Sequence, residues 1–162
     1  MSKWVVKDRF DVIEFEGELI GHASTRKNED QGRWTEIEIY RTDSGKYVVH
    51  RMGCSALFHR VGQPCTSSRG EKVRGEDISD ESIGCPDCDP DEDFDEDAEY
   101  VHEVTESSAD VVTEARDLRK ALVIVNKQTG REFLSSVAYA ALQEAVRYDR
   151  SLLGVFERRI NI

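Results

Sequence analysis

The stretch Trp34-Thr35-Glu36-Ile37-Glu38-Ile39-Tyr40 has the clearest alternation of side chains in this 162-residue chain. Successive side chains of a β-strand point to opposite faces of a sheet, so the two isoleucines and Thr35 share one face. The next residues, Asp43-Ser44-Gly45, are typical of a tight turn, and residues 46–50 resume a strand pattern. These residues predict a β-hairpin.

Toward the N-terminus the pattern predicts more strands. Residues 10–16 alternate, and residues 18–23 suggest a neighbouring strand after Gly17. Residues 24–32 contain no large apolar side chain and predict an exposed loop. On the other side of the hairpin, residues 56–58 form a short apolar stretch. The first 60 residues therefore predict a meander of three to five antiparallel strands.

Toward the C-terminus the period changes from that of a strand to that of a helix. Apolar side chains recur at the i, i+3, i+4 and i+7 spacing of an amphipathic helix, at Leu134, Val137, Ala138, Ala141, Leu142, Ala145 and Val146. A shorter helix is predicted over residues 114–122. Residues 123–125 can extend it or begin a hairpin that turns at Gln128-Thr129-Gly130. The sequence predicts an α+β fold, in which C-terminal helices cover one face of the N-terminal meander.

Four cysteines suggest a metal site between these two parts. Cys54, Cys65, Cys85 and Cys88 lie within 35 residues, and the last two form the pair Cys85-Pro86-Asp87-Cys88. A two-residue gap lets both thiolates of one turn reach the same zinc ion. We therefore predict a structural Zn²⁺ held by the four cysteines, with an alternative in which His50 or His59 replaces Cys54 or Cys65.

Other uses of the cysteine pair fit less well. A redox role needs a thiolate stabilised by positive surroundings, whereas the neighbours here are Asp87, Asp89, Asp91 and Glu92. A catalytic zinc needs an open position beside a general base, and the deaminase pattern of His-x-Glu with Pro-Cys-x-x-Cys is missing. The sequence also lacks Gly-x-Ser-x-Gly, His-Glu-x-x-His and phosphate-binding glycine loops. We expect no catalytic residues.

The net charge of −11 is concentrated in one segment. Residues 87–114 contain 13 acidic side chains and no lysine or arginine. Such a segment repels phosphate backbones and attracts basic surfaces, so direct nucleic-acid binding is not expected. We predict a partner-binding surface with carboxylates and two aromatic anchors, formed by Asp91, Glu92, Asp93, Phe94, Asp95, Glu96, Asp97 and Tyr100.

These observations lead to three hypotheses of function. The first is a non-enzymatic, zinc-stabilised interaction protein that binds a basic protein partner. The second is a mimic of nucleic acid that inhibits a DNA- or RNA-binding enzyme of a defence or restriction system. The third is a zinc-dependent hydrolase or transferase.

The predicted organisation is one compact domain in three parts. Residues 1–60 form the antiparallel sheet, residues 61–100 the inserted zinc-stapled loop and acidic segment, and residues 101–162 the helical part that packs on the sheet. Neither a signal peptide nor a membrane span is recognised, so we expect a cytoplasmic protein without membrane contact.

Residues 33–50 read Arg-Trp-Thr-Glu-Ile-Glu-Ile-Tyr-Arg-Thr-Asp-Ser-Gly-Lys-Tyr-Val-Val-His. In this stretch the chain resembles the EXLDI family of small actinobacterial proteins, in which a Tyr-Arg-Thr turn leads to a Tyr-Val-Val-His strand. The resemblance continues from Asp117-Leu118-Arg119 to the C-terminus. There the family's Glu-x-Leu-Asp-Ile signature faces residues 158–162, which lack both acidic residues. The resemblance implies no known activity and no site residues.

Overall fold

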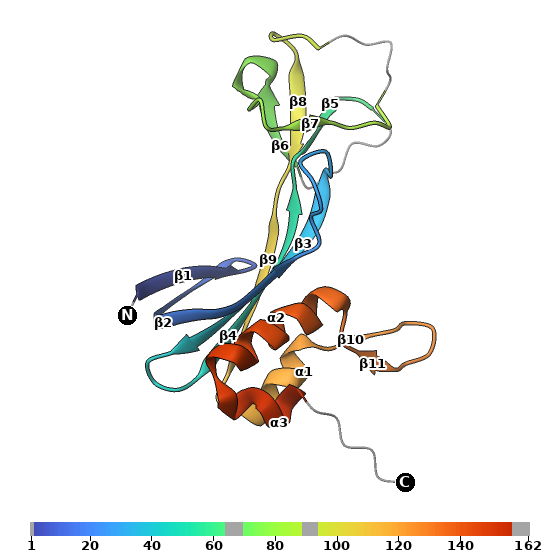
Figure 1. The fold of residues 1–162 in the computed structure, drawn as a ribbon. Helices are drawn as coiled ribbons and strands as arrows, with labels where there is room; N and C mark the ends of the chain where they lie inside the picture. Colours follow the sequence, from blue (N-terminus) through green and yellow to red (C-terminus); the bar gives the residue numbers. More distant parts are fainter. Residues whose placement is uncertain (1, 64–69, 89–93, 157–162) are drawn as a thin grey trace. The chain divides into compact units, whose positions relative to one another are not determined.

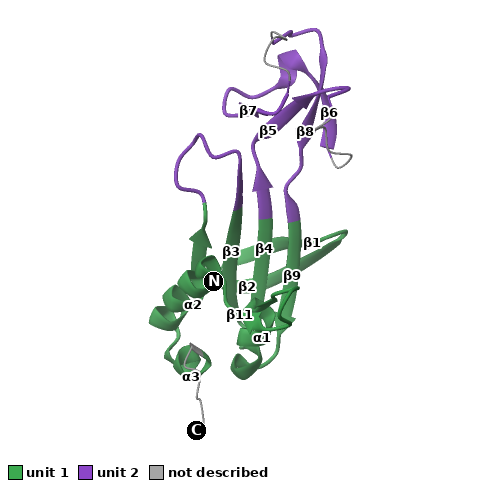
Figure 2. Ribbon diagram, turned by 90° about the vertical axis from the view of Figure 1, so that its right-hand side faces the viewer, with its two compact units in different colours: residues 1–25, 35–52, 107–162 green, residues 26–34, 53–106 purple. Residues whose placement is uncertain are grey.

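The computed structural model describes residues 2–63, 70–88 and 94–156, and its chain divides into two compact units (Figures 1 and 2). Unit 1 comprises Met1–Thr25, Thr35–Met52 and Ser107–Ile162, and unit 2 comprises Arg26–Trp34 and Gly53–Glu106. The chain therefore passes between the units four times.

Unit 1 is built on an antiparallel sheet that is curled into a half-barrel. Its strands are β1 (Ser2–Asp8), β2 (Asp11–Ser24), β3 (Arg33–Thr42), β4 (Tyr47–Ser55) and β9 (Glu106–Val112), in the order β1-β2-β3-β4-β9. The turn after β1 lies against β9, because the Arg9 backbone N–H donates to the Ser107 carbonyl over 2.8 Å. This hydrogen bond lies between the two ends of the strand order, as a curled sheet requires.

Helix α2 (Ser136–Tyr148) packs on β2 and covers one face of this sheet (Figure 1). It begins where the Ser135 hydroxyl accepts from the Ala138 N–H, as an N-cap serine does. Its apolar stripe joins Ile37 and Ile39 of β3 in the main core. The remaining elements are η2 (Ala115–Asp117), α1 (Leu118–Leu122), the hairpin β10 (Ile124–Val125) with β11 (Glu132–Phe133), η3 (Arg150–Leu152) and α3 (Leu153–Phe156).

Small residues allow α2 to approach the sheet closely. A Cβ added to Gly21 of β2 would lie 2.3 Å from the Ala141 carbonyl oxygen and 3.0 Å from the Ala145 Cβ. Ala141 and Ala145 are themselves fully buried. The contact between helix and strand therefore depends on the absence of a side chain at Gly21.

Unit 2 contains a second, four-stranded sheet. Its strands are β5 (Leu57–Arg60), β6 (Gly70–Arg74), β7 (Ile83–Gly84) and β8 (Glu99–Glu103), in the order β6-β8-β5-β7, and η1 (Gly75–Asp77) follows β6. β8 pairs antiparallel with both β5 and β6, whereas β7 pairs parallel with β5. The rings of Phe58, Phe94 and Tyr100 form an aromatic cluster in this unit.

The predicted α+β class is confirmed, with 47% strand and 21% helix. The helical stripe forms α2 from Val137 to Val146, with Leu134 before the helix, and residues 124–125 follow the hairpin alternative as β10. Other predictions were wrong. Residues 11–16 and 18–23 belong to the single strand β2, and Phe10 lies in the turn before it. Residues 70–74 form a strand instead of a loop, and β8 and β9 occupy the start of the segment expected to be helical.

The glycine at position 17 explains the first of these errors. It lies within β2, and a Cβ there would come within 2.2 Å of the Arg41 carbonyl oxygen on β3. Gly17 thus permits a close approach of two strands and does not mark a turn. Among the described helices, none combines the length and apolar character needed to span a membrane.

Candidate metal site

Three ligand atoms converge in unit 2. One nitrogen of His59 and the sulfurs of Cys85 and Cys88 all lie within 4.8 Å of one another, and such a group can hold a metal ion. His59 belongs to β5, whereas the two cysteines follow β7. This triplet of side chains is the candidate metal site.

Backbone pairing brings the cysteines beside the histidine. Phe58 of β5 is the register partner of Gly84 of β7, and the Cys85 N–H continues this pairing by donating to the Phe58 carbonyl over 3.0 Å. The turn that follows is closed by the Cys88 N–H, which donates to the Cys85 carbonyl over 3.3 Å. The strand pair positions Cys85, and the turn returns Cys88 to the same side.

The spacing of these atoms fits a tetrahedral zinc ion. The His59 Nδ1 and the Cys88 Sγ are 3.8 Å apart. With zinc bonds of about 2.0 Å to nitrogen and about 2.3 Å to sulfur, a tetrahedral angle places two such ligands about 3.5 Å apart. A zinc ion therefore requires almost no movement of this pair.

Glu103 of β8 holds the other nitrogen of His59. The His59 Nε2 lies 2.5 Å from the Glu103 Oε2, the Arg33 Nε donates to Oε1 over 2.8 Å, and the Ser55 hydroxyl donates to Oε1 over 2.8 Å. The hydrogen bond from Arg33, with those from His59 and Ser55, outweighs the raising effect of burial and lowers the pKa of Glu103 to about 2. The carboxylate is therefore ionised at neutral pH.

The ionised carboxylate fixes the tautomer of His59. A carboxylate only accepts hydrogen bonds, so the His59 Nε2 must carry the proton that lies between them. In the neutral ring the Nδ1 then presents its lone pair toward the cysteine sulfurs. An outer carboxylate that orients a ligating histidine in this way is a recurrent feature of protein zinc sites.

The three residues of the candidate metal site differ in burial. The His59 side chain is fully buried, and Cys85 and Cys88 are half-buried. The cysteine side of the group is therefore the side that is open to solvent.

The structure divides the residues of the predicted metal site. Cys85 and Cys88 come together with His59, the histidine of the sequence alternative. Cys54 is buried in β4 and is not a member of the group, and Cys65 lies outside the described residues. His50 belongs to unit 1 and contacts Glu38 and Ser107 instead.

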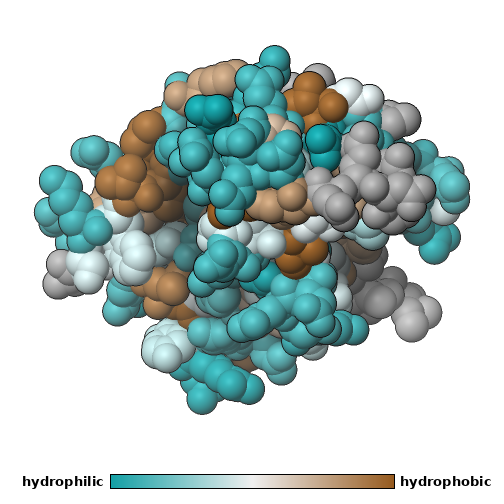
Figure 3. Space-filling model, turned by 90° about the horizontal axis from the view of Figure 1, so that it is seen from above, coloured by the Kyte–Doolittle hydropathy of each residue, from teal (hydrophilic) through white to brown (hydrophobic). Residues whose placement is uncertain are grey.

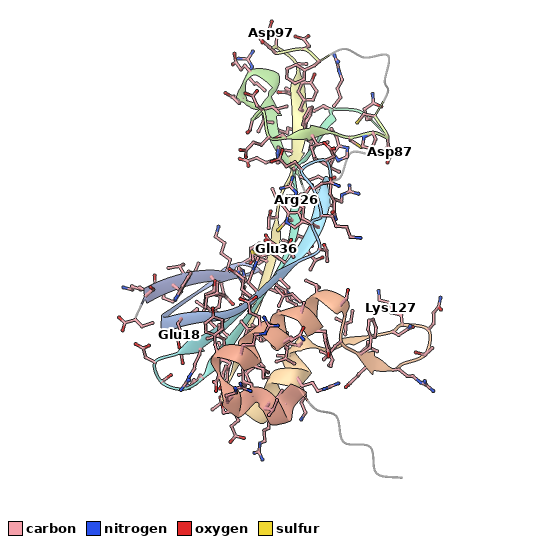
Figure 4. All side chains as sticks on the ribbon, viewed as in Figure 1. Glu18, Arg26, Glu36, Asp87, Asp97 and Lys127 are labelled. Atoms are coloured by element: carbon pink, nitrogen blue, oxygen red, sulfur yellow. The ribbon has the colours of Figure 1, made fainter. Side chains whose placement is uncertain are left out.

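The residues of the predicted partner surface differ in their exposure to solvent, and three of them are not described. Asp91, Glu92 and Asp93 lie outside the described residues. Phe94 and the acidic run Asp95, Glu96 and Asp97 are exposed, and Asp97 and Asp87 lie on different loops (Figure 4). Tyr100 is only 3% exposed, so it is a core residue of unit 2 and not a surface anchor.

Sequence reasoning missed the residues that support His59. Arg33, Ser55 and Glu103 are far apart in the chain and share no motif with the cysteine pair. Only the pairing of β8 with β5, which sets His59 opposite Val101, brings Glu103 near the site. No signal in a single sequence gives this pairing.

Unit 1 contains a Ser–His–Glu arrangement that links four strands of its sheet. The His50 Nδ1 lies 2.8 Å from the Glu38 Oε1, and its Nε2 lies 2.5 Å from the Ser107 hydroxyl. The Ser107 hydroxyl donates its single proton to the Lys7 carbonyl over 2.7 Å. This network ties β1, β3, β4 and β9 together.

Comparisons with known proteins found no match: no family model, no curated protein and no solved structure matches the chain.

Proposed function

We propose that this chain is a non-enzymatic interaction protein in which a structural zinc ion stabilises unit 2. The observation that supports this proposal is the convergence of His59, Cys85 and Cys88, with Glu103 orienting the histidine. When bound, the ion supplies a cross-link between β5 and the turn after β7.

A structural role fits the surroundings better than a catalytic one. The described carboxylate in contact with the site is Glu103, and it already accepts from Arg33, Ser55 and His59. A general base needs a carboxylate free to take a proton from water. Glu103 is committed to positioning His59, which disfavours the hydrolase hypothesis.

The interaction role is supported by the charge of the two units. Unit 2 contains 18 acidic and 7 basic side chains, a net charge of −11, whereas unit 1 contains 15 of each and has no net charge. The whole net charge of the protein thus belongs to the unit with the metal site. A basic protein surface is the complementary partner.

Metal content and single substitutions test the zinc proposal. We expect about one zinc per chain after purification without chelator, and loss of zinc in Cys85→Ser, Cys88→Ser and His59→Ala. Cys54→Ser is the matched control, because Cys54 is a buried cysteine outside the group. Full zinc content in both Cys85→Ser and Cys88→Ser contradicts the proposal.

A further variant addresses the fourth ligand. The sequence predicts Cys65 as a metal ligand, and Cys65→Ser tests this prediction. In the cobalt-substituted protein, thiolate-to-metal absorption grows with the number of bound sulfurs. Three thiolates in the parent chain and two in Cys65→Ser would support Cys65, whereas an unchanged spectrum assigns the fourth position to another donor.

Nucleic-acid mimicry remains the second candidate because of the same charge. A partner that binds the chain and nucleic acid at the same time excludes mimicry. Mutual competition for one groove of the partner supports it.

A further inference from the structure

Unit 2 has a pocket beside the metal site. Its volume is about 280 Å³, and its lining includes Phe58 of β5, Ile78 after η1 and Phe94 before β8. Successive side chains of a strand alternate in direction, so Phe58 and the metal ligand His59 point to opposite faces of β5. The pocket and the metal site therefore share one strand but use different faces of it.

The aromatic wall of the pocket is held in place by the core. Phe94 stacks on the buried Tyr100, with ring centroids 5.3 Å apart and planes 20° from parallel. The Asp95 N–H donates to the Tyr100 hydroxyl over 2.9 Å, which fixes the turn that carries Phe94. Phe94 is nevertheless 53% exposed, so an apolar face is presented to solvent in a fixed position.

The rim of the pocket is acidic. Glu76, Asp80 and Glu96 line it, and its lining among the described residues includes no lysine or arginine. Arg74 contacts Glu76 over 3.7 Å, but both side chains are more than half exposed, so this pair is weak. Hydrophilic residues cover most of the face seen in Figure 3, with hydrophobic residues exposed between them.

We propose that this pocket binds an arginine side chain of the basic protein partner, an inference that rests on the proposed interaction function. The volume lies just below the range of about 300–1,000 Å³ found for small-molecule sites, and it suits a single side chain. A guanidinium stacks on aromatic faces, is weakly hydrated, and pairs with carboxylates through several donors. Phenylalanine rings beside three carboxylates provide both kinds of contact.

The test uses a blocked pentapeptide with one central arginine and follows the Phe58 and Phe94 ring signals of the full chain by NMR. We expect saturable shifts with arginine, and none with citrulline, which keeps the shape of the side chain but has no charge. Equal shifts with the citrulline peptide overturn the proposal, since they remove the need for charge.

Two neighbouring acidic residues give a matched pair of variants. Glu96→Gln removes a carboxylate from the pocket, and Asp97→Asn removes one from the same turn outside the lining. We expect Glu96→Gln to weaken peptide binding by about tenfold, as for loss of a charged hydrogen bond, and Asp97→Asn to change it by less than twofold. Equal weakening in both variants overturns the pocket in favour of general attraction to an acidic surface.

Metal content measured on the same samples separates the two proposals. If the parent chain contains zinc at full stoichiometry and its ring signals do not respond to arginine, the pocket proposal fails and the metal site stands. If the signals respond in a chain that contains no zinc, the pocket proposal stands and the metal assignment fails.

Discussion

Glu103 is the residue that positions His59 in the candidate metal site. Its carboxylate holds the proton-bearing nitrogen of His59 and is itself held by Arg33 and Ser55. A side chain that touches only the ligand still changes metal affinity, because it sets the tautomer and the orientation of the ring.

Glu103→Gln should therefore weaken zinc binding by about 10- to 100-fold, the usual cost of losing an outer partner of a ligating histidine. A competition titration with a chromophoric chelator measures this change. Glu99→Gln is the matched control, since Glu99 is an exposed residue of the same strand. Equal affinities of the two variants would remove Glu103 from any positioning role.

Asp149 is a buried carboxylate that stabilises unit 1. Burial raises its pKa, but hydrogen bonds from Ser151 and Tyr47, with the nearby Arg41, outweigh burial and place the pKa below its ordinary value. The Tyr47 hydroxyl donates to it over 2.7 Å. The folded state thus favours the ionised form.

Because the folded pKa of Asp149 is depressed, its stabilising effect is present above the unfolded value of about 3.9 and is lost as the pH falls through the lower folded value. Asp149→Asn should reduce the free energy of unfolding by about 2 kcal/mol at pH 7, the scale of a hydrogen bond to a charged group. Urea denaturation from pH 7 to pH 3 should show the gap between parent and variant closing only below about pH 4. A gap that widens on acidification would contradict this sign.

At the scale of elements, the contact between α2 and β2 is the most sensitive to an added side chain. The Ala141 carbonyl occupies the space that a Cβ of Gly21 would need. A branched side chain at position 21 must push the helix away from the sheet, and overpacking of this kind costs about 1–3 kcal/mol.

Gly21→Val is thus expected to lower the unfolding free energy by about 2–3 kcal/mol. Thermal and chemical denaturation followed by circular dichroism measures it. Gly154→Ala is the control, because Gly154 lies in α3 with no atom within 4 Å of its added Cβ. Similar losses in both variants would show that the glycine contact is not the cause.

Elements with a strong local pattern were predictable from the sequence. The apolar stripe of α2 and the alternating isoleucines of β3 each mark the face that packs in the main core, so the period of the side chains reports the structure. Strand β8 has no such local signal, since the acidic residues Glu99 and Glu103 lie at its ends. Its conformation is set by pairing with β5 and β6, which are distant in sequence.

Only the part of the candidate metal site that follows a local pattern was predictable from the sequence. The pair Cys85 and Cys88 follows a local spacing rule, and both cysteines belong to the group. No spacing rule favours His59 over Cys54, because that choice depends on which residue of two distant segments faces the turn after β7. The number of cysteines led to the prediction of Cys54 as a ligand, whereas the pairing of β5 with β7 places His59 beside Cys85 and Cys88.

At the scale of the whole molecule, the two units have separate sources of stability. Unit 1 has a large core formed by the sheet and the helices. Unit 2 has one sheet of four short strands, β5 to β8, and a small aromatic cluster. Zinc binding of about 10–16 kcal/mol in small peptides is comparable to the stability of an entire domain.

Removal of zinc with a chelator should therefore unfold unit 2 and leave unit 1 folded. Hydrogen exchange should show loss of protection in β5 and β8, while α2 keeps its protection. Re-addition of zinc should restore the parent pattern, which serves as the control for irreversible damage. Unchanged exchange in β5 and β8 would mean that the metal does not stabilise unit 2.

The four passages of the chain between the units have a consequence for dissection of the protein. They fall after Thr25, Trp34, Met52 and Glu106. A protease that cleaves one connection leaves three covalent links, so a nicked chain stays together until a denaturant is added. Neither unit can be obtained as a simple fragment of the gene, and an isolated unit 2 requires a new linker between its two segments.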